Sequence, residues 1–226
     1  MDKVFVERVA SCRRCPRLVD YLSALPPKGG RGREDYWNRP VPGFGDPQAR
    51  VLLVGLAPGA HGANRTGRPF TGDGAGDFMY PLLHQAGFAN RPDVSDLGDG
   101  LRLTDLYISN AVKCAPPENK PLPVEFDQCR PFLAAELAAL PRLKVVLALG
   151  QGAFVSCLRL FKEAGLVARL SDCPFGHGAA YPLSNGLTLV ASYHTSRYNV
   201  QTRRIDAPMF LDLLAQVREL ALRENG

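Results

Sequence analysis

The chain has 226 residues, of which 46% are hydrophobic and 22% are charged, and its formal net charge is +5. This composition supports one substantial core and excludes a disordered or fibrous protein, so we expect a single domain over residues 1–226. No apolar run approaches the roughly 20 residues of a membrane helix, and the first residues lack the order of a signal peptide. We therefore expect a soluble, cytoplasmic protein with no membrane partner.

The first fifty residues differ from the rest of the chain. A short helix is predicted over 4–10, and a basic segment rich in proline and glycine follows at 26–33. Such a basic loop is usually solvated, and the alternative is a loop that contacts DNA. We interpret residues 1–50 as an N-terminal arm that wraps the domain.

Four short apolar segments predict buried strands, because they are aliphatic throughout and do not alternate with polar residues. They cover residues 51–55, 106–112, 144–150 and 187–192. Apolar residues recur at helical spacing over 77–86, 124–140, 151–161 and 207–222. Strands that alternate with helices predict right-handed βαβ units, so we expect a three-layer α/β/α fold around a central four-stranded parallel sheet.

In open parallel sheets, ligands bind beyond the carboxyl ends of the strands. In this chain those ends are followed by residues 55–73, 110–120, 150–152 and 193–204. We expect the functional site in these four loops.

Four of the six cysteines have the spacing of a metal site. Cys12 and Cys15 form a C-x2-C pair, and fourteen residues separate Cys114 from Cys129. Four thiolates complete either a tetrahedral zinc site or a [4Fe-4S] cluster, and the spacing neither chooses between them nor excludes four free thiols. Cys157 and Cys173 lack such spacing, and we expect both to be free core residues.

The segment 55–73 reads GLAPGAHGANRTGRPFTGD, and its small residues let backbone N–H groups approach a ligand. It lacks the Gly-Lys-Ser/Thr ending of a phosphate-binding P-loop. Together with NAVKCAPP at 110–117 and YHTS at 193–196, it resembles the iron–sulfur uracil-DNA glycosylases, specifically the fifth (type B) family of that superfamily. The resemblance runs from Cys12 to about Arg204.

The resemblance implies a monofunctional DNA-repair enzyme of the base-excision pathway. Such an enzyme would flip a deaminated base out of DNA and hydrolyse its N-glycosidic bond, leaving an abasic site. The base would be uracil, and hypoxanthine or ethenocytosine would be further substrates. The resemblance also favours iron over zinc, with a [4Fe-4S] cluster on the four spaced cysteines that ties the N-terminal arm to the core.

Several residues are candidates for binding the flipped base. Phe70 would stack on it, unless it is a core phenylalanine, and Asn110 would read its pairing edge, unless its amide only holds a loop. Asn119 is a second carboxamide candidate, with a turn as the alternative. The loop after the first strand adds Gly55, Ala57, Gly59 and His61.

His194 follows the last strand and would donate a hydrogen bond to uracil O2 as negative charge develops there. Better-known relatives carry Asp, Glu or Asn in the first motif to orient the water, and this chain has Ala60 to Ala63 there. Either Asp73 orients the water, or leaving-group stabilisation supplies most of the rate; we favour the second. Asp73 is equally consistent with a cap on the following helix.

The segment after His194 combines cations with an aromatic residue. Tyr198 would fill the gap left by the flipped base, while Arg197, Arg203 and Arg204 would contact DNA. The alternative is the start of a solvated helix. We expect a monomer, and the sequence does not indicate whether it contacts a sliding clamp.

Two further hypotheses belong to other classes of protein. One is an iron–sulfur electron carrier, which the distant origin of the four cysteines disfavours because it indicates a structural role. The other is a zinc-stabilised module that binds nucleic acid without chemistry.

Overall fold

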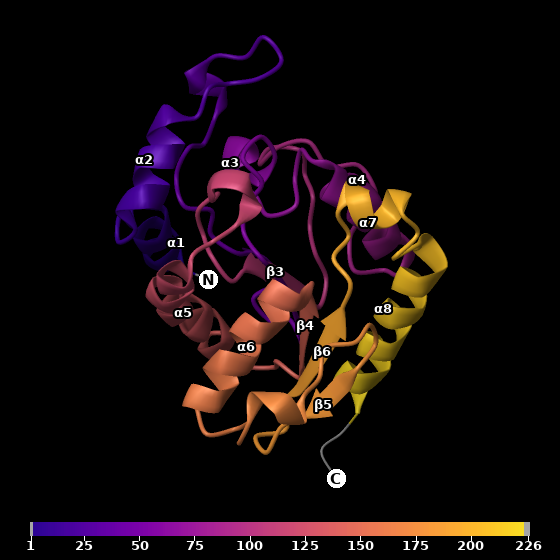
Figure 1. The fold of residues 1–226 in the computed structure, drawn as a ribbon. Coiled ribbons are helices and arrows are strands. Elements are labelled where there is room, and N and C mark those ends of the chain that lie inside the picture. The colour runs from indigo at the N-terminus through magenta and orange to yellow at the C-terminus, as the bar shows by residue number, and fades with distance from the viewer. Residues whose placement is uncertain (1, 224–226) are drawn as a thin grey trace.

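The computed structural model describes residues 2–223. Its centre is one six-stranded sheet in the order β1-β3-β2-β4-β6-β5 (Figure 1). The four middle strands are parallel, as predicted: β2 (Val51–Gly55), β3 (Leu106–Asn110), β4 (Val145–Leu149) and β6 (Thr188–Ser192). Two antiparallel edge strands were not predicted, β1 (Phe44–Gly45) and β5 (Ala180–Pro182), because two or three residues carry no period.

Helices cover both faces of the sheet, which confirms the α/β prediction. The helices are α1 (Lys3–Ala10), α2 (Pro16–Ala24), α3 (Ala63–Thr66), α4 (Gly74–Gln85), α5 (Pro123–Ala138), α6 (Gln151–Glu163), α7 (Arg197–Gln201) and α8 (Ala207–Leu222). Three short 3-10 turns are η1 (Arg33–Asp35), η2 (Pro117–Asn119) and η3 (Leu170–Asp172). Within the described residues, no helix is long and apolar enough to cross a membrane.

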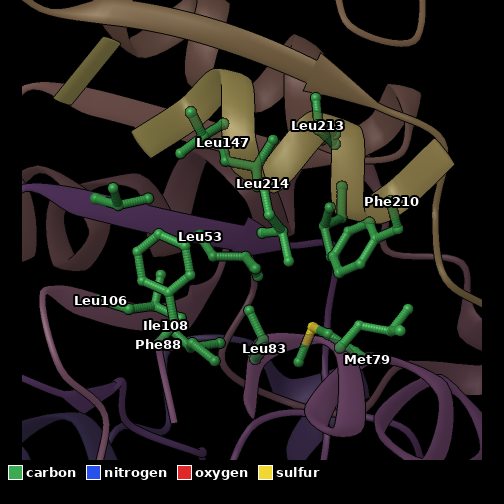
Figure 2. Close-up of a cluster of buried hydrophobic side chains, with 14 of the residues drawn as sticks. Leu53, Met79, Leu83, Phe88, Leu106, Ile108, Leu147, Phe210, Leu213 and Leu214 are labelled. Carbon is green, nitrogen blue, oxygen red and sulfur yellow. The ribbon is translucent and has the colours of Figure 1, made fainter. Parts of the chain in front are cut away.

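Alternate residues of each central strand supply two separate cores. Leu53 and Leu147 face α4 and α8, where Phe210, Leu214 and Met79 join them (Figure 2). On the opposite face, the strand residues pack against α5 and α6. Because successive strand side chains point to opposite faces, a strand that is apolar throughout fits a sheet covered on both sides.

The N-terminal helices α1 and α2 lie beside α5 and build a third, smaller apolar cluster (Figure 1). Phe5 and Leu18 contribute to it from the N-terminal side, and Phe132 contributes from α5. The guanidinium of Arg17 donates two hydrogen bonds, each of 2.8 Å, to the buried carboxylate of Glu125. This pairing fixes α2 against the start of α5.

Candidate active site and cysteine centre

The loops at the carboxyl ends of β2, β3 and β6 meet around a pocket of about 530 Å³. Its lining includes most of the residues selected from the sequence: Ala57, Gly59, His61, Phe70, Asp73, Asn110, Asn119, His194 and Arg197. Gly55, Tyr198, Arg203 and Arg204 are not among the lining residues. The pocket therefore lies where the rule for parallel sheets places a ligand.

Phe70 and Asn110 both lie directly against Gly55. A Cβ atom on Gly55 would collide with the Asn110 carboxamide and would lie 2.5 Å from the Phe70 ring. The Phe70 ring also lies 6.0 Å from the His194 ring, at an interplanar angle of 31°. Phe70 is only 7% exposed and packs on the main core, so it joins a core and lines the pocket at once.

Buried polar groups hold the turn that carries Phe70, whose φ of 53° is unusual for a residue with a side chain. Arg68 pairs with Asp99 through two nitrogens, at 2.9 and 2.5 Å, and donates to the Thr71 hydroxyl at 3.0 Å. The Arg68 hydrogen bonds keep the pKa of Asp99 well below its usual range. Tyr80 donates its hydroxyl to the Pro69 carbonyl at 2.9 Å, and burial raises its pKa to about 12.

Asn110 ends β3 and is held by a buried ion pair. Lys113 donates to the Asn110 backbone carbonyl at 2.9 Å and to the Glu136 carboxylate at 2.6 Å. Neither partner of this pair is more than 1% exposed. Asn119 reaches the pocket from η2, where its φ of 57° is one that asparagine tolerates better than most residues.

His194 follows β6 and is half-buried. Asn199 donates its side-chain amide to the His194 backbone carbonyl at 2.8 Å, which fixes this turn of the chain. Within the described residues, His194 Nδ1 is buried and has no hydrogen-bond partner. Burial lowers the pKa of His194, and the nearby Asp73 charge opposes that shift only in part. A neutral imidazole with an unpaired nitrogen therefore faces the pocket.

Asp73 caps α4 and also lines the pocket. Its Oδ1 accepts the N–H groups of Ala75 and Gly76 at 3.0 and 3.1 Å. Its Oδ2 lies against the Gly59 to Gly62 turn, so that a Cβ atom on Gly62 would collide with it. The capping interpretation is confirmed, and one carboxylate oxygen remains available to the pocket.

Of the predicted DNA-contacting residues, Arg197 lines the pocket. Tyr198 is 72% exposed on α7, as an aromatic wedge requires. Arg203 is exposed as well. The Arg204 guanidinium lies 4.8 Å from the centre of the Tyr193 ring, a cation–π contact that the sequence did not reveal.

Cys12, Cys15, Cys114 and Cys129 line one small cavity together with apolar residues of α2 and α5. Burial raises the pKa of the Cys114 thiol, and nearby Cys129 adds to that shift. Burial likewise raises the pKa of Cys129, to about 11, although the Lys113 N–H donates to its Sγ at 3.3 Å. Cys157 is buried in α6, as expected, and Cys173 is half-buried.

The four-cysteine cavity differs from a site for one metal ion. Among residues 2–223, no three His, Cys, Asp or Glu side chains are grouped closely enough to hold a single ion. Buried thiols stay protonated unless a cation compensates their charge. The four cysteines lie around one cavity, where a bound cation would compensate the charge of their thiolates.

A pocket at the carboxyl edge of a parallel sheet, lined by an aromatic ring, carboxamides and imidazoles, is typical of proteins that bind a planar heterocycle. The family model described as the uracil DNA glycosylase superfamily matches residues 42–218. Because that match covers most of the chain, and close relatives carry one family name, the chain belongs to the type-5 family of the uracil DNA glycosylase superfamily.

Those relatives match over nearly their whole length. A type-5 uracil-DNA glycosylase of Thermus thermophilus is 52% identical over 98% of this chain and 99% of its own. Proteins of the same name from Mycobacterium leprae and Pyrobaculum aerophilum are 42% and 40% identical, over 95% and 98% of this chain and 93% and 92% of theirs. These matches give no support to an electron carrier or to a non-catalytic zinc module.

Proposed function

We propose that this protein is a monofunctional DNA glycosylase that removes uracil from DNA and leaves an abasic site. The observation that carries the proposal is the half-buried imidazole of His194, with its lowered pKa, beside the Phe70 ring and Asn110 in one pocket. Its relatives' names and the family match support the same activity. A glycosylase needs a pocket that excludes water and receives a base turned out of the stack.

Phe70, Asn110 and Asn119 would bind the flipped base. The Phe70 ring offers a stacking surface, and it is held by the buried Arg68 to Asp99 pair. The Asn110 carboxamide can donate and accept at the pairing edge, and Lys113 fixes the backbone that carries it. Gly55, Ala57 and Gly59 keep the first loop thin enough for backbone groups to approach the base.

The reaction breaks the bond between C1′ of the sugar and the base nitrogen. The bonding electrons leave with the base as an anion, and the sugar becomes an oxocarbenium-like cation. An N–H of His194 would stabilise the charge on the departing base, and it would do so without any change in its own protonation. Water then adds to C1′, and the proton that it releases neutralises the base anion, so the products are the free base and the abasic site.

Asp73 would at most orient that water through Oδ2, because Oδ1 caps α4. A water needs little activation against an oxocarbenium ion, so leaving-group stabilisation supplies most of the rate. The first-loop residues Ala60 to Ala63 place no carboxylate at the pocket, and this supports broader use of hypoxanthine or ethenocytosine.

The four cysteines line one cavity, and they would hold a [4Fe-4S] cluster. The resemblance to the iron–sulfur glycosylases favours this cluster over zinc. When bound, the cluster would crosslink α1 and α2 to α5, which makes residues 1–50 an arm tied to a single domain.

Arg197, Arg203 and Arg204 would contact the DNA backbone, and the exposed Tyr198 would enter the gap left by the flipped base. We propose that the protein is a monomer. We also propose that the protein acts in the cytoplasm, which is consistent with a role in DNA repair.

The test is cleavage of an oligonucleotide that carries one uracil, followed by alkali to break abasic sites. Wild-type protein is expected to give a single break at the uracil, and none in the matched thymine strand. Parallel strands with hypoxanthine and ethenocytosine measure the breadth of the pocket. Absence of a break with every deaminated base would exclude the glycosylase activity.

A further inference from the structure

A tyrosine of the N-terminal arm contacts a histidine of the pocket. The hydroxyl of Tyr36 lies 3.0 Å from Nδ1 of His61, and the two rings meet edge to face with centres 6.0 Å apart. Tyr36 is 8% exposed, and His61 lines the pocket. The arm therefore supplies the partner of one group in the pocket wall.

Main-chain contacts fix this tyrosine relative to the loop that carries His61. The next two residues donate their backbone N–H groups into α3: Trp37 to the Arg65 carbonyl at 2.9 Å and Asn38 to the Asn64 carbonyl at 3.1 Å. The Asn64 side chain also donates to that of Asn38 at 3.0 Å. Because α3 follows His61 directly, tyrosine and histidine are held on one rigid unit.

The hydrogen bonds of Tyr36 indicate where its proton lies. The Lys28 backbone N–H donates to the Tyr36 hydroxyl at 3.1 Å, which occupies one lone pair of the oxygen. Within residues 2–223, His61 Nδ1 is the one remaining hydrogen-bond partner of that hydroxyl. Donation of the Tyr36 proton to Nδ1 satisfies the hydroxyl as a donor as well as an acceptor, and in that arrangement Nδ1 is the acceptor.

When Nδ1 of a neutral imidazole accepts a hydrogen bond, the ring proton is on Nε2. Burial lowers the pKa of His61, and the charge of Lys28 adds to the shift, so the ring is neutral at physiological pH. A neutral imidazole with Nδ1 engaged in this way can donate from Nε2 and cannot accept there. The pocket wall thus presents a fixed N–H donor at His61.

Such a donor distinguishes a deaminated base from its parent. Deamination replaces an exocyclic amino group, which donates, by a carbonyl oxygen, which accepts. We propose that Tyr36 is a positioning residue that holds His61 as an Nε2–H donor, and that this donor selects flipped bases with a carbonyl oxygen over bases with an amino group. The selectivity rests on the proposed glycosylase function, whereas the tautomer does not.

Nitrogen-15 NMR of the histidine rings in the free, full-length protein tests the tautomer without any substrate. The His61 signals, identified by their loss in His61→Asn, are expected to show a protonated Nε2 and an unprotonated Nδ1 at pH 7.5. Tyr36→Phe keeps the ring and removes the hydroxyl, so it should convert these signals to a mixture of tautomers. Tyr21→Phe is the control, because Tyr21 lies on α2 and is not among the residues that line the pocket.

A protonated Nδ1 in the wild-type protein would overturn the proposal. Unchanged His61 signals in Tyr36→Phe would overturn the role of the tyrosine. Both outcomes leave the proposed glycosylase function untouched, because neither measurement uses DNA. The wild-type spectrum decides the first point even if Tyr36→Phe folds poorly.

Binding of uncleavable oligonucleotides tests the selectivity. Strands with 2′-fluoro-deoxyuridine or 2′-fluoro-deoxycytidine at one position slow departure of the base, so equilibrium affinities can be measured. Tyr36→Phe should reduce the preference for the uridine strand about tenfold, the scale of one hydrogen bond, with Tyr21→Phe unchanged. An unchanged preference in Tyr36→Phe would refute the selectivity, and so would a wild-type protein without preference. Failure of the proposed function would appear instead as the absence of cleavage at uracil.

Discussion

Gly62 and Asp73 lie so close together that a Cβ atom on the glycine would collide with the aspartate side chain. The same carboxylate caps α4 through its other oxygen. One residue thus joins the first pocket loop to the helix that supports Phe70. Its structural and catalytic contributions must be measured separately.

Asp73→Asn separates the two contributions, because asparagine is also a good helix cap and lacks the charge. We expect Asp73→Asn to keep wild-type stability and a glycosylase rate within about tenfold of wild type, whereas Asp73→Ala should lose about 1 kcal/mol of unfolding free energy. His194→Ala should lose about 10²- to 10³-fold in rate, the cost of one lost anion-stabilising donor. Urea unfolding and single-turnover cleavage measure these effects. Equal rate losses for Asp73→Asn and His194→Ala would instead identify Asp73 as the group that orients the water.

Gly55→Ala should damage base binding, because its Cβ atom would strike both the Phe70 ring and the Asn110 carboxamide. We expect the KM for uracil-containing DNA to rise about tenfold or more, in keeping with the loss of at least 1.4 kcal/mol of base contacts. Gly176→Ala is the matched control, since its Cβ atom would meet only Ala179 at an ordinary 3.8 Å. Equal KM values for the two variants would show that the Gly55, Phe70 and Asn110 packing does not limit binding.

The pocket was predictable because its residues follow strands that the sequence shows clearly. Val51–Gly55 and Val145–Leu149 are buried throughout. A continuous run of apolar residues in the sequence therefore corresponds directly to a buried strand in the structure. Once four strands are parallel, their carboxyl ends bring Phe70, Asn110 and His194 together. The roles of these residues came from the resemblance to a known family, which spacing alone does not give.

The groups that hold the pocket were not predictable. Lys113 and Glu136 lie 23 residues apart, and Arg68 and Asp99 lie 31 apart, so nothing local signals that each pair is buried. Charged residues are exposed by default, and only the fold reveals which ones find a partner. The contact of Tyr36 with the pocket was not predicted either, because the sequence around Tyr36 is typical of an irregular loop. Only the structure shows that this segment packs on α3.

The buried Arg68 to Asp99 pair should be costly to break. Asp99→Asn leaves a buried guanidinium without its counter-charge, and we expect a loss of about 3–5 kcal/mol in unfolding free energy. Asp172→Asn, in the exposed pair with Arg169, should change it by less than about 1 kcal/mol. Because the folded-state pKa of Asp99 lies below its unfolded value, its contribution is present above about pH 4 and is lost as pH falls further. Urea unfolding at pH 7 and pH 3 checks both effects. The gap between wild type and Asp99→Asn should be smaller at pH 3 than at pH 7, and a gap that is equal or larger at pH 3 would contradict the sign.

The cysteine assignment predicts different outcomes for the two classes of cysteine. Cys129→Ser should lose most of the iron and labile sulfide of the freshly purified protein, whereas Cys157→Ser should retain both. Cys157 is an apt control because it is equally buried and lies outside the four-cysteine cavity. Zinc in place of iron in the wild-type protein would refute the cluster, and full iron retention in Cys129→Ser would remove Cys129 from its ligands.

His194 should keep its neutral form, and its catalytic contribution, well below the pH at which an exposed histidine titrates. Burial lowers its pKa from the usual value of about 6.5, and the Asp73 carboxylate opposes the shift. His61 and Arg197 line the same pocket and are the other charged or titratable side chains to consider. We expect single-turnover rates to be flat from pH 8 to 6.5, with any break due to His194 below that range. Asp73→Asn removes the opposing negative charge, so the break should move to still lower pH, and His61→Asn tests whether the second imidazole causes it. A break above pH 6.5 that persists in His61→Asn and moves upward in Asp73→Asn would contradict a neutral, desolvated His194.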